Sequence, residues 1–270
     1  MKLSVGPVRE GLLPGGLPVL TAGQGPPLVV FRHFAPNNAN PVGFWRWTEL
    51  RPFAGLMRER RIHLVSRKPG LDENVSMAEL AAQHATALSE HFSGPVDVVG
   101  VATGGLVAQQ LAADRPDLLR KLVLIGTACR LGQSARTARQ DCADHLRRSE
   151  RMAAYAALGR GAAVSPLGQY IATAVLRAME PIDRAHHPPD LIAVMNAEIT
   201  FDLTDRLPEI TAPTLLVAGD RDAGYPLELI RLTADRIPDA RLVVLPRRGR
   251  RLVLDDHRLV PAIRAFLDER

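Results

Sequence analysis

Apolar runs alternate with helix-forming stretches along most of the chain. The apolar runs are rich in valine, leucine and isoleucine and lie at 26–33, 61–68, 96–102, 119–128, 213–220 and 240–247. Their continuous apolar character suits strands that are covered on both faces, as in a mostly parallel sheet. Helix candidates lie between them, at 44–59, 77–91, 104–114, 226–236 and 257–269. The alternation predicts a doubly wound α/β fold with about eight strands, in which ligands bind beyond the carboxyl ends of the strands.

The alternation is interrupted once, between Arg130 and about Pro208. This segment contains several helical stretches, including 167–179, but no good strand. Prolines divide it, at positions 166, 181, 188 and 189. We therefore predict a core domain formed by residues 1–130 and 209–270, and an inserted helical cap, formed by residues 131–208, over the active edge of the sheet.

Length and composition are those of a globular protein with one large core. The chain has 270 residues, of which 46% are hydrophobic, and no apolar run approaches the roughly 18 residues that span a bilayer. The N-terminal sequence MKLSVGPVREGLLPGG lacks the layout of a signal peptide. Cys129 and Cys142 are too few for a disulfide framework and lack metal-ligand spacing. We expect a cytoplasmic protein without a membrane partner, a metal or a cofactor.

The formal net charge is +5, and arginine carries nearly all of the positive charge. A GC-rich genome explains abundant arginine and alanine through codon bias. Alternatively, some arginines bind anionic ligands, because the planar guanidinium binds a carboxylate through two hydrogen bonds. The arginines are spread along the chain without basic-aromatic interleaving, so we expect no nucleic-acid partner.

The stretch GVATGG, residues 100–105, lies between an apolar strand and an amphipathic helix. It follows the pattern G-x-S-x-G, in which a sharp turn presents a nucleophilic serine, except that its centre is Ala102. Together with the order of strands, the mid-chain cap and the sequence LLVAGDRD (215–222), this stretch resembles the α/β-hydrolase superfamily from about Gly16 to Phe266. The resemblance implies an α/β-hydrolase fold.

The resemblance also assigns the catalytic positions of the family. The nucleophile position is Ala102, which has no lone pair, so an acyl-enzyme cannot form there. The acid position is Asp222, although Asp220 is close enough to compete for it. The base position is Arg250, which stays protonated and cannot act as a general base. His257 is the nearest histidine, and its place near the start of the last helix is typical of an exposed residue.

The turn that follows the strand LVVF also departs from the family. It reads RHFAPNNANP, with Arg32 and His33 where the family has small residues whose backbone N–H groups face the substrate. Bulky polar side chains there would fill or change the oxyanion pocket. Thr103 follows Ala102 directly, but successive side chains in such a turn point in different directions, which argues against Thr103 as a replacement nucleophile.

The nucleophile, base and oxyanion turn are altered together, so we interpret the protein as a naturally non-hydrolytic member with a degenerate triad. Arg32, His33, Asp222 and Arg250, with Ala102 and Thr103 beside them, are expected to surround an anionic small molecule or modified peptide. Arginines would fix a carboxylate while His33 or Asp222 moves a proton. We therefore predict a tailoring enzyme of bacterial natural-product biosynthesis, either a peptidyl-aspartate isomerase or epimerase or a cyclase. In its size and its losses the chain resembles atypical members such as the bottromycin-type peptide epimerase.

Two alternatives stay open at this point. The protein could be an inactive pseudohydrolase that binds a small molecule or a partner protein in the old cavity. It could also be a serine esterase that is disabled by alanine at position 102, by nature or by engineering. Turnover would separate an enzyme from a receptor, and Ala102→Ser would revive a disabled esterase. The oligomeric state is not predicted.

Overall fold

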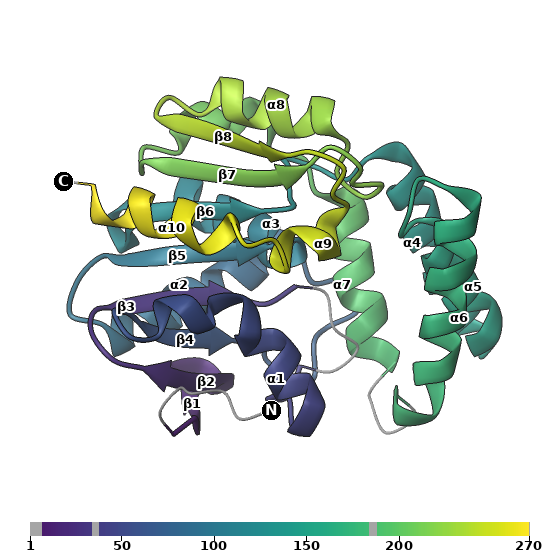
Figure 1. Cartoon of the computed structure of the whole chain (residues 1–270). Coiled ribbons are helices and arrows are strands. Elements are labelled where there is room, and N and C mark those ends of the chain that lie inside the picture. The colour runs from purple at the N-terminus through teal and green to yellow at the C-terminus, as the bar shows by residue number, and fades with distance from the viewer. Residues whose placement is uncertain (1–6, 34–37, 184–187, 270) are drawn as a thin grey trace.

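A computed structural model describes residues 7–33, 38–183 and 188–269 of the chain; for 178–183, 188 and 250–251 it describes the backbone alone. An eight-stranded sheet lies at the centre of the molecule, in the order β1-β2-β4-β3-β5-β6-β7-β8 (Figure 1). Its strands are β1 (Arg9–Leu13), β2 (Leu17–Gly23), β3 (Pro27–Phe31), β4 (Arg61–Val65), β5 (Val96–Val101), β6 (Leu119–Ile125), β7 (Thr214–Gly219) and β8 (Ala240–Leu245). Strands β3 to β8 pair in parallel, and β2 pairs antiparallel with both β1 and β4.

Helices cover both faces of this sheet, with α1 and α10 on one side and α2 and α3 on the other (Figure 1). The bounds of the helices around the sheet are α1 (Gly43–Leu50), α2 (Met77–His91), α3 (Thr103–Asp114), α8 (Leu227–Arg236), α9 (Arg250–Leu254) and α10 (Leu259–Asp268). The central strands between them are buried; every residue of β5 and β7, for example, is buried. The predicted doubly wound, mostly parallel sheet is confirmed.

Two segments differ from the predicted elements. The predicted helix 44–59 ends as an α-helix at Leu50 and continues as a 3₁₀ helix, Arg51–Leu56, because Pro52 has no N–H to donate to the helix. The strands β1 and β2 were not located in the sequence. They form a hairpin around Pro14, Gly15 and Gly16, and the largely exposed β1 carries no continuous apolar run.

In the described part of the chain, four α-helices are inserted between β6 and β7, and we call them the cap. They are α4 (Gln133–Arg147), α5 (Arg151–Arg160), α6 (Pro166–Asp183) and α7 (Pro188–Thr200). The cap lies beyond the carboxyl ends of the parallel strands (Figure 1). It contains a small apolar cluster of its own, made of Cys142, Ala143, Ala154, Ala157, Leu191, Ile192 and Met195. The domain boundaries at 131 and 208 stay a prediction.

Cys129 and Cys142 are both buried and are not joined in a disulfide. Within the described ranges, no helix is long and apolar enough to cross a membrane.

Two histidines are buried in the core domain. His84 on α2 donates from Nδ1 to the carbonyl of Leu80 at 2.7 Å and packs edge-on against Phe31, with ring centroids 4.5 Å apart. Burial lowers the pKa of His84 to about 4. Burial also lowers the pKa of His63 on β4 to about 4, with a further contribution from the charge of His91. Both rings are therefore neutral in the folded protein at physiological pH.

These histidines predict a loss of stability in mild acid. Between the ordinary value of 6.5 and the folded value of about 4, the unfolded chain binds protons that the folded chain excludes. The free energy of unfolding should fall as the pH is lowered through this window, by up to about 1.4 kcal/mol per pH unit for each histidine. Urea unfolding at about three pH values between 5 and 7 measures this slope. His84→Gln, which keeps a donor for Leu80, should flatten the slope, and an unchanged slope would contradict the assignment.

Candidate active site

The turn between β5 and α3 has the backbone of a nucleophile elbow. Ala102, at its centre, has φ 49° and ψ −114°, a left-handed conformation that residues other than glycine rarely adopt. Its N–H donates to the carbonyl of Ile125 at 3.0 Å, and its carbonyl accepts from the N–H of Gly105 at 2.8 Å. The elbow is thus retained although the side chain at its centre is a methyl group.

Glycines allow the elbow helix to approach the sheet. A Cβ atom at Gly104 would lie 2.2 Å from the carbonyl oxygen of Phe31, at the end of β3. A Cβ at Gly105 would lie 2.4 Å from the side chain of Thr127. The first turn of α3 therefore packs directly on the backbone that leads into Arg32 and His33.

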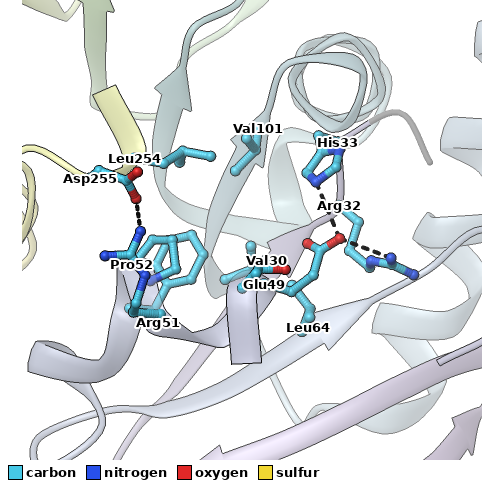
Figure 2. Close-up of a pocket in the computed structure, with 12 residues that line it drawn as sticks. Val30, Arg32, His33, Glu49, Arg51, Pro52, Leu64, Val101, Leu254 and Asp255 are labelled. Carbon is cyan, nitrogen blue, oxygen red and sulfur yellow. Dashed lines mark hydrogen bonds and ion pairs between the residues drawn. The ribbon is translucent and has the colours of Figure 1, made fainter. Parts of the chain in front are cut away.

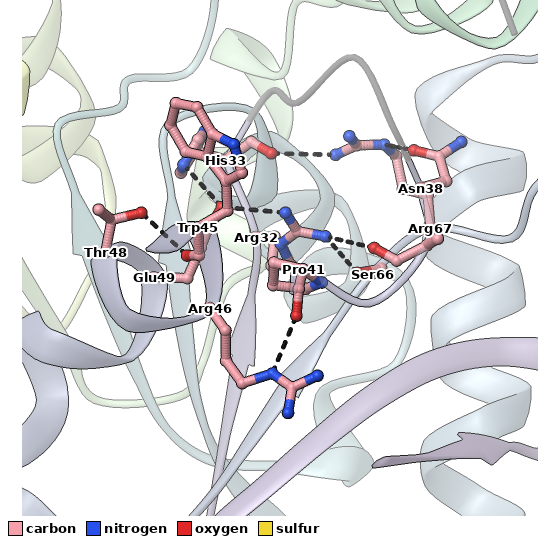
Figure 3. Close-up of polar contacts among 11 residues, drawn as sticks. Arg32, His33, Asn38, Pro41, Trp45, Arg46, Thr48, Glu49, Ser66 and Arg67 are labelled. Carbon is pink, nitrogen blue, oxygen red and sulfur yellow. Dashed lines mark hydrogen bonds and ion pairs between the residues drawn. The ribbon is translucent and has the colours of Figure 1, made fainter. Parts of the chain in front are cut away.

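Glu49 on α1 accepts hydrogen bonds from the side chains of Arg32 and His33, the two residues that follow β3. Its Oε1 accepts from Arg32 Nη2 at 2.9 Å and lies 3.1 Å from His33 Nε2 (Figures 2 and 3). Burial raises the pKa of Glu49, but the charges and hydrogen bonds of His33 and Arg32 outweigh it and hold the pKa well below its usual range. The ionised carboxylate only accepts, so Nε2 of His33 donates to it, and in the neutral form of the ring Nδ1 carries the lone pair.

Arg32 also has structural partners. Its Nη1 donates to Ser66 Oγ at 2.6 Å and to the carbonyl of Ala39 at 3.0 Å. The side chain is 6% exposed, compared with 36% for His33. An anionic ligand would therefore have to compete with the protein for the Nη groups of Arg32, and its predicted role as a ligand-binding residue stays a prediction.

A small cavity of about 60 Å³ lies beside this group. Its polar end is formed by Arg32, His33 and Glu49, and an ion pair between Arg51 and Asp255 lies at the opposite side (Figure 2). The remaining lining residues are Val30, Thr48, Pro52, Phe53, Leu64, Val101 and Leu254. Because one water needs roughly 10–15 Å³ of such space, the cavity has room for a few waters or for a small reacting group.

Thr103, the first residue of α3, is fully buried and does not line this cavity. Its hydroxyl donates to Oε1 of Glu198 on α7. The other carboxylate oxygen of Glu198 accepts from Arg139 Nε on α4 at 2.7 Å. The structure thus directs the Thr103 side chain toward the cap, and its predicted contact with a ligand stays a prediction.

Asp222 and Asp220, the two candidates for the acid position, have different environments. Asp222 is buried, and its Oδ1 accepts from the N–H groups of Gly224 at 2.8 Å and Tyr225 at 3.1 Å. Its Oδ2 is also buried and has no hydrogen-bond partner in the described part of the chain. Asp220 is exposed and accepts from the N–H of Arg248. Asp222 is therefore the better match to the acid position, but it is not among the residues that line the cavity.

Arg250 begins α9 directly after Gly249, but its side chain lies outside the described residues. Its predicted contact with a ligand therefore stays a prediction. The preceding loop lies beside the loop that carries Asp222, because the N–H of Arg221 donates to the carbonyl of Arg248 at 2.9 Å. His257 is 86% exposed and lies 3.7 Å from Asp256, away from the cavity.

The sequence analysis did not identify Glu49, Glu198, Arg51 or Asp255. Glu49 and Arg51 lie in the segment TELRP, and a charged residue in such a helix normally faces solvent. Their partners come from segments far away in the sequence, and spacing alone gives no signal for such pairs.

Residues 34–262 match the model of the alpha/beta hydrolase family. The chain belongs to this family. A pimeloyl-[acyl-carrier protein] methyl ester esterase of Chromobacterium violaceum is 28% identical over 240 residues, which cover 85% of this chain and 89% of that protein. A Variovorax paradoxus protein, provisionally named as the carbamate hydrolase RutD, is 34% identical over 191 residues, covering 66% of this chain and 68% of that protein. An esterase of Thermogutta terrifontis shares the fold with a TM-score of 0.73 at 23% identity, over 97% of this chain and 98% of that one.

The predicted α/β-hydrolase fold is confirmed, but the predicted function is wrong. The relatives are named as hydrolases of esters and carbamates, which overturns the prediction of a non-hydrolytic isomerase, epimerase or cyclase. The prediction took the joint alteration of the nucleophile at Ala102, the base at Arg250 and the oxyanion turn to exclude hydrolysis. These changes exclude only the covalent route of the family, because water activated by another general base also attacks carbonyl carbon.

The conformation of Ala102 predicts an unusual response to glycine. Ala102→Gly and Ala108→Gly each remove one buried methyl group from the same region. Glycine relieves the positive φ at position 102, whereas within α3 it adds only the helix penalty. Ala102→Gly should therefore retain about 2 kcal/mol more stability than Ala108→Gly. Urea unfolding of both variants measures this difference, and equal losses would show that the elbow is not strained.

Proposed function

We propose that the protein hydrolyses a small carboxylic ester or carbamate, with water as the nucleophile and His33 as the general base. The observation that carries this proposal is the pair of His33 and Glu49 on a small cavity beside the elbow. A histidine whose second nitrogen is held by a carboxylate is a recurring arrangement for proton transfer at carbonyl carbon. It supports hydrolysis in a chain whose elbow residue, Ala102, cannot attack.

The proposed reaction balances without a covalent intermediate. The lone pair on Nδ1 of His33 takes a proton from water while the water oxygen bonds to the carbonyl carbon. Glu49 holds the ring through Nε2 and offers a compensating charge to the imidazolium. The tetrahedral intermediate then collapses, the bond to the leaving oxygen or nitrogen breaks, and the imidazolium returns the proton to that atom.

The start of α3 is the candidate oxyanion site. The first N–H groups of a helix have no acceptor within the helix, and its N-terminus carries a partial positive charge. The N–H of Thr103 is in this position, one residue after Ala102. Backbone N–H groups of this kind stabilise the negative oxygen of a tetrahedral intermediate. The retained elbow thus has a use even without a serine.

The cavity and one relative favour a small leaving group. That relative is named for a methyl ester, whose leaving group is methanol, although its acyl part is carried by an acyl-carrier protein. A cavity of about 60 Å³ admits a small reacting group. An acidic group on the substrate would bind most readily at Arg51, whose ion pair with Asp255 is partly exposed, with 37% and 41% of the two side chains accessible.

The proposal predicts that His33 is required for turnover. The parent should hydrolyse members of a panel of methyl esters, short p-nitrophenyl esters and simple carbamates above the buffer rate. His33→Ala should lower kcat/KM by about a hundredfold to ten thousandfold, because it removes the general base. His257→Ala, which removes an exposed histidine outside the cavity, is the matched control and should leave kcat/KM unchanged. If the parent hydrolyses nothing in the panel, or if both variants remain equally active, the proposal is wrong.

Water attack also predicts that no covalent intermediate forms. Mass spectra of the protein quenched during turnover should show the unmodified mass, and serine-directed phosphonates should not label it. A stoichiometric acyl or phosphonyl adduct would show that a side chain attacks the substrate.

A further inference from the structure

One buried contact joins the elbow to two helices of the cap. Thr103 on α3 donates to Glu198 on α7, and Glu198 accepts in turn from Arg139 on α4. We call these residues the elbow–cap contact. Thr103 and Glu198 are completely buried, and the side chain of Arg139 is 13% exposed. The three residues are far apart in the sequence, and they meet at the first turn of α3, which carries the candidate oxyanion donor.

We propose that Thr103 is a positioning residue, which holds the first turn of α3 against the cap so that its N–H groups face the reacting carbonyl. This inference rests on the proposed hydrolysis. The N-cap residue of α3 is Ala102, which has no side-chain oxygen to accept from the first N–H groups of the helix. Glu198 supplies a negative charge at this end of the helix instead, where the helix dipole favours it.

Arg139 makes this arrangement compatible with the proposed chemistry. A buried carboxylate near the start of α3 would by itself oppose the negative charge that develops on the carbonyl oxygen. The hydrogen bond from Arg139 pairs that charge, so that the first turn keeps its attraction for the oxyanion. The contact therefore fixes the helix without adding an unpaired charge to the site.

The other end of α7 has a separate attachment to the core domain. Asp190 accepts from the N–H groups of Gly70 at 3.0 Å and Leu71 at 2.8 Å. Removing the Thr103 hydroxyl should therefore loosen α7 near Glu198 while its beginning near Asp190 stays in place. This difference along one helix provides an internal control.

Thr103 as the nucleophile is the competing role for the same hydroxyl. The side chain does not line the cavity, and its hydroxyl is directed to Glu198 on α7, which also accepts from Arg139. Covalent modification of Thr103 during turnover would identify that role and overturn the positioning role.

The test compares Thr103→Val, which loses the hydroxyl at nearly constant shape, with Thr103→Ser, which keeps it. Amide hydrogen exchange of the full chain should become about tenfold to a hundredfold faster in Thr103→Val at 106–110 and 196–200. Thr103→Ser should match the parent, and exchange near Asp190 should not change. Thr86→Val is the control, since it removes an exposed helix hydroxyl that bonds only within α2. Unchanged exchange in Thr103→Val would overturn the inference.

Activity separates this inference from the proposed function. Thr103→Val should lower kcat about tenfold or more with little change in KM, and Thr103→Ser should restore it. If exchange rises as expected but kcat is unchanged, Thr103 joins the cap without positioning the reaction, and the inference is wrong. If exchange rises while the parent hydrolyses nothing, the elbow–cap contact stands and the proposed hydrolysis fails.

Discussion

The approach of α3 to the ends of β3 and β6 is the constraint on which the candidate site depends. Gly104 and Gly105 lie so close to the carbonyl of Phe31 and the side chain of Thr127 that neither position has room for a Cβ. This approach brings the backbone before His33 against the first turn of the helix. The proximity of His33, the cavity and the first turn of α3 therefore depends on the absence of side chains at two positions.

Polar contacts join the cap to the core domain beside apolar packing. Ala193 and Ala197 of α7 belong to the main hydrophobic core. Glu198 on α7 accepts from Thr103 as well as from Arg139 of the cap, and Asp190 accepts from backbone N–H groups and from Asn38. Withdrawing a charge from water is costly unless its partners have good geometry, so such pairs contribute little net stability. They do define the relative position of the elements, because any displacement leaves a buried charge without its partner.

The sequence predicted the parallel strands and their helices because their periodicity is local, and it located the elbow because only glycine tolerates its close contacts. Prediction failed at Pro52, which ends α1 early through a local effect that the helical pattern concealed. It also failed for the partners of Glu49 and Glu198, which come from distant segments and meet only in the folded chain. Function was misjudged because the joint loss of the family's nucleophile, base and oxyanion turn was taken as the loss of the reaction.

The two ends of the insertion meet where they leave the sheet. Arg130 and Asp202 form an isolated β-bridge, and the N–H of Leu203 donates to the carbonyl of Cys129 at 3.0 Å. Closing a chain loop costs free energy that grows only with the logarithm of its length, by about 0.6 kcal/mol for each doubling. Once the bridge is formed, a longer or shorter insertion changes the cost of closing this loop only slightly. A lineage that keeps this bridge can therefore change the length of its cap, and so explore new substrates, at little cost in chain entropy.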